Sequence, residues 1–107
     1  MGASLAEGLG ETGSDGLPEN PVALMRGHGF VCTADSVEAA ISKCIYTAQN
    51  ARVQMAAAAL GRGGGELRFF SEREAVDAGK ATIAGAAKPW SLWVAEVENN
   101  ALYKNHA

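Results

Sequence analysis

The segment Arg26–Gly29 reads Arg-Gly-His-Gly and places the imidazole of His28 between two glycines. Apolar runs over Val22–Met25 and Phe30–Thr33 flank it, so the spacing predicts a β-hairpin whose four-residue connection carries the histidine at the rim of a sheet. Glycine permits backbone conformations that a side chain forbids, and it leaves the imidazole approachable. By spacing alone, His28 is either a structural residue of the turn or a metal-binding or catalytic group.

Three stretches that follow one another along the chain share a more specific pattern. The segment Pro21–Val31 is followed by Ala-Asp-Ser-Val-Glu-Ala-Ala at 34–40 and by Ile-Tyr-Thr-Ala-Gln-Asn-Ala-Arg-Val-Gln at 45–54. This series resembles the class II aldolase/adducin family, in which an apolar strand runs into a His-Gly turn, a second strand follows, and a long helix carries an Asn-Ala-Arg-x-Gln-like segment. The resemblance implies that residues 21–107 are the C-terminal part of a three-layer α/β/α domain of this family.

The resemblance also implies a chemistry. Enzymes of this family are zinc-dependent aldolases and epimerases that act on sugar phosphates through an enediolate, with three histidines on the metal and an acidic residue as the base. His28 resembles the third zinc ligand. The other two ligands belong to a His-x-His motif in the upstream half of the family domain, which these 107 residues do not contain, and the remaining histidine is His106. We therefore expect an aldolase-like chain that is inactive alone and binds zinc weakly or not at all.

Partners and an alternative function follow from the same resemblance. Known members are rotationally symmetric tetramers in which residues near the C-terminus can approach a neighbouring subunit's active site. This implies a homo-oligomer, gives Tyr103 a possible supporting role in catalysis, and makes a sugar phosphate or similar small carbonyl compound the expected substrate of an active protein. The alternative is a non-catalytic module, as in the adducin branch, where the fold serves protein association without a complete metal site.

The amino-acid composition restricts the class of protein without reference to any family. A chain of 107 residues with 48% hydrophobic residues can form one domain with one core. The net charge is −3, and no run of lysine or arginine could neutralise several phosphates, so no nucleic-acid partner is expected. No apolar stretch reaches the roughly 18 residues of a membrane span, and the N-terminus lacks the basic-then-apolar pattern of a secretory signal. We expect a cytoplasmic protein.

The first half of the chain contains the most secure predicted helix. Residues 1–20 are rich in polar residues and glycine and are predicted to be mobile, with a short helix over Ser4–Leu9 that has nothing to pack against. Asp35 and Glu38 have the spacing of a capping box, which predicts a helix from about Ser36 to Leu60. Its expected apolar face consists of Val37, Ile41, Cys44, Ala48, Ala51, Met55 and Ala59.

The second half of the chain is predicted to add two helices. Ser71 and Glu74 have capping-box spacing and predict a helix that reaches about Ala87. Pro89 then begins a further helix with an apolar face. That face consists of Trp90, Trp93, Val94 and Val97. The tryptophans are either core anchors or interface anchors. We thus expect a small sheet, built on the hairpin, that is covered by the long helix and the C-terminal helices.

Two remaining groups of residues have an alternative chemical interpretation. Cys32 and Cys44 fall in apolar patterns and are interpreted as small buried hydrophobes, while a disulfide between them stays open. The glycine-rich segment 62–65 is interpreted as a connector and not as a phosphate cradle, because it leaves a helix and no Gly-Lys-Ser/Thr follows it.

Overall fold

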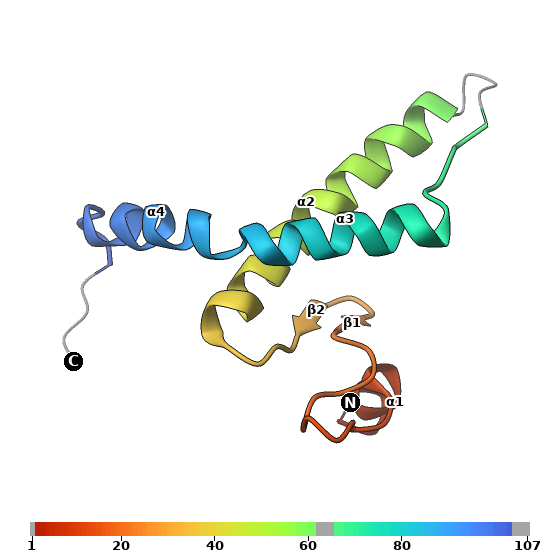
Figure 1. The fold of residues 1–107 in the computed structure, drawn as a ribbon, viewed down its shortest axis with the longest axis horizontal. Coiled ribbons are helices and arrows are strands. Elements are labelled where there is room, and N and C mark those ends of the chain that lie inside the picture. Colours follow the sequence, from red (N-terminus) through yellow and green to blue (C-terminus); the bar gives the residue numbers. More distant parts are fainter. Residues whose placement is uncertain (1, 62–65, 104–107) are drawn as a thin grey trace.

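The structure, a computed structural model, describes residues 2–61 and 66–103. Its elements, in chain order, are α1 (Gly2–Leu9), β1 (Val22–Met25), β2 (Gly29–Cys32), α2 (Val37–Gly61), α3 (Glu72–Gly85) and α4 (Ala87–Glu98). The fold is mixed α and β, as predicted, and the described residues form one two-stranded antiparallel sheet. Figure 1 shows α3 passing across α2 and α4 extending beyond it, with the β1–β2 hairpin between the first half of α2 and α1. The predicted three-layer arrangement is not confirmed.

The hairpin lies where the sequence predicts it, with a shorter connection. Met25 pairs with Gly29 and Val22 with Cys32, so three residues, and not four, connect the strands. The backbone N–H of His28 donates to the carbonyl oxygen of Met25 at 3.0 Å, which closes a β-turn. Gly27 has φ +76° at the third position of this turn, as a type II turn requires. The glycine before the histidine therefore fixes the path of the turn.

Helix α1 confirms the predicted N-terminal helix and corrects its environment. Gly10, with φ +75°, ends the helix and donates its N–H to the carbonyl oxygens of Ala6 and Glu7. The helix packs against β1, where a Cβ built on Gly8 would lie 3.5 Å from the Cβ of Ala23. Ala23 is only 5% exposed. The expectation that this helix has nothing to pack against is wrong, because it covers one face of the hairpin.

Helix α2 begins one residue later than predicted, and its cap is different. The N–H of Ala39 donates to the Oγ of Ser36 at 3.2 Å, so Ser36 is the capping residue. The predicted capping box of Asp35 and Glu38 is therefore wrong by one position. Serine and aspartate are both good N-caps, and the register of the first turn decides between them.

The buried face of α2 also differs from the predicted apolar stripe. Within the stripe, Val37 is 66% exposed and Met55 is 67% exposed, while Cys44 and Ala48 are half-buried. Ser42, outside the stripe, is 5% exposed. Strand β2 contacts the first half of the helix, and among the described residues little covers the second half, where Leu60 is 81% exposed. Periodicity identified the helix but not the part of it that other elements cover.

Helices α3 and α4 follow the local signals closely. The N–H of Glu74 donates to the Oγ of Ser71 at 3.4 Å, and the N–H of Ser71 donates to a carboxylate oxygen of Glu74 at 2.9 Å, which confirms the predicted capping box. Helix α3 ends at Gly85, and α4 begins two residues before Pro89. The two tryptophans of α4 are half-buried, and α4 contacts both α2 and α3.

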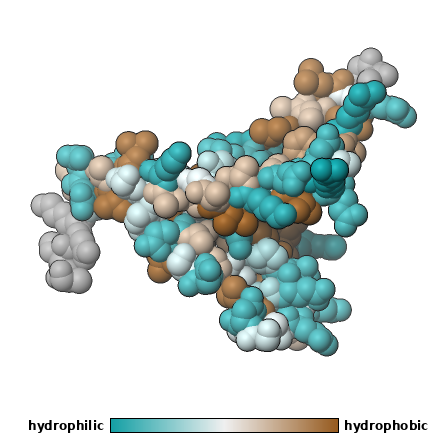
Figure 2. Space-filling view, in the orientation of Figure 1, coloured by the Kyte–Doolittle hydropathy of each residue, from teal (hydrophilic) through white to brown (hydrophobic). Residues whose placement is uncertain are grey.

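The chain is less compact than a typical domain of its length. Its accessible surface is 9031 Å², whereas a compact monomer of 11.1 kDa has about 5,700 Å². The radius of gyration is 16.9 Å, against about 13 Å for a compact domain of this length. Figure 2 shows hydrophobic residues at the surface at the far end of α2 and along α4. Across residues 2–61 and 66–103, no helix combines the length and the apolar character that a membrane crossing requires.

Candidate functional site

His28 lies at the exposed tip of the hairpin. Its backbone N–H donates a hydrogen bond to the carbonyl oxygen of Met25. The turn therefore fixes the backbone position from which the imidazole projects. A Cβ built on Gly27 or on Gly29 would meet no atom within 4 Å, so the space beside both glycines is open. The predicted position of His28 at the rim of the sheet is confirmed, and its role as a metal ligand stays a prediction.

The described part of this chain does not surround His28 with further metal ligands. Within residues 2–61 and 66–103, no group of three or more histidines, cysteines, aspartates or glutamates is placed to hold a metal ion. His106 and the connector at 62–65 lie outside the described residues. A catalytic zinc usually takes three protein ligands and a water. The residues described here therefore do not fit a zinc site by themselves.

Tyr103, the second predicted site residue, lies far from the hairpin in the same chain. It follows α4, where its backbone N–H donates to the carbonyl oxygen of Asn100 at 3.0 Å, and it is 60% exposed. Figure 1 shows the end of α4 and the β1–β2 hairpin well apart. The predicted role of Tyr103 concerns a neighbouring subunit's site, so it stays a prediction.

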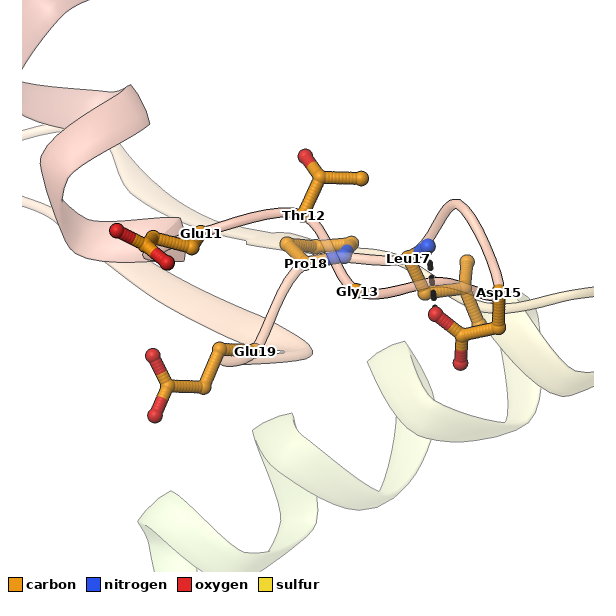
Figure 3. Close-up of a pocket in the computed structure, with 7 residues that line it drawn as sticks. All are labelled: Glu11, Thr12, Gly13, Asp15, Leu17, Pro18 and Glu19. Atoms are coloured by element: carbon orange, nitrogen blue, oxygen red, sulfur yellow. Dashed lines mark hydrogen bonds between the residues drawn. The ribbon is translucent and has the colours of Figure 1, made fainter.

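The loop between α1 and β1 forms a shallow hollow of about 500 Å³. An isolated bridge between Thr12 and Pro18 closes the loop, and the N–H of Leu17 donates to a carboxylate oxygen of Asp15 at 3.0 Å. Figure 3 shows the carboxylate of Asp15 at the opposite end of the loop from those of Glu11 and Glu19. The hollow thus results from the shape of the loop, and its carboxylates do not converge on a common cation site.

A pair of thiols lies where β2 meets α2. The Sγ of Cys32 is 3.9 Å from the Oγ1 of Thr47, and the Nζ of Lys43 donates to the carbonyl oxygen of Thr33 at 2.7 Å. Both cysteines are free and half-buried. Burial raises the pKa of the Cys44 thiol, and the adjacent Cys32 thiol raises that pKa further, against a smaller lowering by Lys43.

The sequence left a pairing of Cys32 and Cys44 open but did not predict it. Cys32 and Cys44 are twelve positions apart and form no Cys-x-x-Cys motif, so spacing alone does not bring them together. The order of the predicted elements could have indicated the pairing, because Cys32 ends a strand and Cys44 lies in the first half of the helix that follows. A short connection of four residues between β2 and α2 makes the two elements neighbours.

Comparison with known proteins gives one informative similarity. The chain is 38% identical over 114 aligned residues to the decarboxylase TropJ of Talaromyces stipitatus, and the alignment covers 100% of this chain and 43% of the relative. The chain thus spans less than half the length of that relative. No family model matches the chain. No solved structure matches it either.

Proposed function

We propose that this chain is the His28-bearing part of a lyase of the class II aldolase/adducin type, acting on a small carbonyl compound that carries a carboxylate or a phosphate. The observation that carries the proposal is the 38% identity to a decarboxylase along the whole chain. The hairpin that presents His28 supports it, because the residues that resemble the family begin there. The proposal refers to the assembled protein, since the chain spans 43% of the relative.

Aldol cleavage and decarboxylation place the same demand on a site. In each reaction a carbon–carbon bond breaks, and its electron pair remains on a carbon next to a carbonyl group. The departing fragment is an aldehyde or ketone in one case and carbon dioxide in the other, and a proton then takes the place of the lost bond. Both reactions are accelerated by groups that stabilise the enolate oxygen. A decarboxylase similarity and an aldolase-like resemblance are therefore compatible chemically.

His28 is proposed as one ligand of a zinc ion whose other ligands come from outside the described residues. A neutral imidazole is a common zinc ligand. The open space beside Gly27 and Gly29 leaves room for a second segment to approach the imidazole. The part that the metal plays in the reaction depends on ligands and a base that the described residues do not provide.

The surrounding domain is proposed to be a three-layer α/β/α domain that assembles into a homo-oligomer. Support comes from the large accessible surface, 9031 Å² against about 5,700 Å² for a compact monomer. The hairpin supplies two strands, and further strands would pair with its edges. Tyr103 is proposed to support the site of a neighbouring subunit. This role is compatible with the separation of Tyr103 from the hairpin of its own chain.

A non-catalytic association module, as in the adducin branch, is the second candidate. The exposed apolar residues favour it, because surfaces of this kind mark protein contacts. Phe69 and Phe70, 78% and 73% exposed, lie in the segment before α3, which forms neither helix nor strand. The two candidates differ in one property: the lyase needs His28, and the module does not.

Turnover measurements on a reconstituted protein test the proposal. The chain is co-expressed with the part of the T. stipitatus decarboxylase that it does not match, and small keto acids and sugar phosphates are assayed with zinc. We expect no turnover by the chain alone and measurable turnover by the mixture. His28→Ala should abolish turnover, while Arg26→Ala, in the same turn, should retain most of it. Full association without any turnover would favour the association module, and turnover that survives His28→Ala would refute the proposed role of His28.

A further inference from the structure

We propose that Cys32 and Cys44 form an oxidisable dithiol, a modification site at which a low-molecular-weight disulfide converts the two thiols into a disulfide that ties β2 to α2. The inference rests on the packing of the strand against the helix and is independent of the proposed lyase activity.

Two separate contacts bring the strand end onto one turn of the helix. The side chain of Cys32 reaches Thr47, with Sγ and Oγ1 3.9 Å apart. The next residue along the strand, Thr33, accepts a 2.7 Å hydrogen bond from Lys43. Cys44 lies between these two anchoring positions of α2, and three residues before Thr47, so it shares a helix face with Thr47. These two contacts therefore place Cys44 beside the end of β2 that carries Cys32.

The surroundings make the two thiols unequal. Cys32 lines a groove of about 560 Å³ that runs from the 16–18 loop to the start of α2. Cys44 does not line the groove, and burial disfavours its thiolate. A thiolate is the attacking species in disulfide exchange, and access controls which thiol reacts. Cys32 is thus placed to react first, and Cys44 to resolve the intermediate.

The reaction balances with glutathione disulfide as the oxidant. The Cys32 thiolate attacks one sulfur, its proton having gone to solvent, and releases one glutathione thiolate. Cys44 then attacks the Sγ of Cys32, loses its proton, and releases the second glutathione. The two cysteines lose two electrons and two protons, and one glutathione disulfide becomes two glutathione thiols. The product disulfide closes a loop of 13 residues that contains the start of α2.

A consequence concerns the strand that begins beside His28. Strand β2 runs from Gly29, next to the histidine, to Cys32, so a disulfide at its far end anchors the hairpin to α2. Oxidation should then slow amide hydrogen exchange in β2, because local opening of the hairpin away from the helix is prevented.

Mass spectrometry of the full chain tests the proposal. The chain is equilibrated with glutathione disulfide, quenched in acid and alkylated, and its peptides are mapped. We expect the loss of both free thiols together and a peptide pair joined through Cys32 and Cys44. A chain that carries one glutathione on each cysteine, a crosslink only between chains, or two thiols that persist, would overturn the proposal.

Single substitutions test the order of attack. In Cys44→Ser, the glutathione adduct on Cys32 should accumulate, because nothing resolves it. In Cys32→Ser, the adduct on Cys44 should form about tenfold more slowly, because Cys44 does not line the groove and burial disfavours its thiolate. Equal rates, or a faster Cys44, would refute the assigned order. Circular dichroism checks that each variant folds, and the mapping of the unsubstituted chain does not depend on them.

Discussion

Replacing Gly27 with alanine isolates the conformational requirement of the turn that carries His28. The added methyl group meets no atom within 4 Å, so no steric clash with neighbours contributes. The backbone of Gly27, however, has φ +76°, a left-handed conformation that costs a residue with a side chain about 1–2 kcal/mol. We expect Gly27→Ala to lower the free energy of unfolding by that amount.

Gly79 offers a matched control of opposite sign. It lies inside α3, and a Cβ built there also meets no atom within 4 Å. Alanine is favoured over glycine by about 1 kcal/mol within a helix, so Gly79→Ala should stabilise the chain. The same chemical change at two open positions should therefore differ by roughly 2–3 kcal/mol, from backbone conformation alone.

Thermal unfolding followed by circular dichroism measures this difference. For a chain of this length, 1 kcal/mol corresponds to a shift of about 4–8 °C in Tm. Gly27→Ala should thus lower Tm by at least about 4 °C, and Gly79→Ala should raise it by a similar amount. An unchanged Tm for Gly27→Ala, or shifts of the same sign in both variants, would refute the assignment of the turn. In the reconstituted protein, Gly27→Ala should also reduce turnover, since it alters the position of His28.

Three further predictions concern α3 and the exposed surface. Ser71→Ala should lower the free energy of unfolding by about 1 kcal/mol in denaturant titrations, because it removes the N-cap of α3, and an unchanged midpoint would contradict this. Hydrogen bonds from the Ser71 side chain and backbone lower the pKa of Glu74 below its ordinary value of 4.5, so its contribution to stability should be present above that pH and be lost as the pH falls through the lowered pKa. Glu74→Gln should flatten this acid dependence, and an identical pH profile in both proteins would count against it. On a sizing column the chain should elute as an oligomer or aggregate, because its 9031 Å² of surface leaves apolar faces uncovered, and a sharp monomer peak with a cooperative thermal transition would argue for an independent module.

Local signals predicted most elements of the fold. The alternation of apolar runs and glycines located the hairpin, and the Ser71 and Glu74 pair located the start of α3, because turns and caps depend on a few adjacent residues. The cap of α2 was misplaced from Ser36 to Asp35, since two capping residues stand side by side.

Tertiary features were harder to predict. The apolar stripe of α2 is only partly buried: Cys44 is half-buried, whereas Val37 and Met55 are exposed. Amphipathicity does not say which neighbours are present to cover a helix face. The approach of Cys32 to Cys44 depends on the packing of β2 against α2 and has no signature in spacing. For the candidate site, the turn that presents His28 was predictable, whereas its proposed partners lie outside the described residues.

Zinc titration with and without the upstream part of the domain tests whether His28 completes a metal site whose other ligands lie outside this chain. The chain, the unmatched part of the T. stipitatus decarboxylase, and the two together are each titrated at neutral pH by calorimetry. We expect no stoichiometric tight binding by the chain alone, tight binding by the complex, and a loss of at least about tenfold in affinity for His28→Ala in the complex, with Arg26→Ala unaffected. Tight binding by the chain alone that is lost in His28→Ala, or an affinity of the complex that does not depend on His28, would contradict this role.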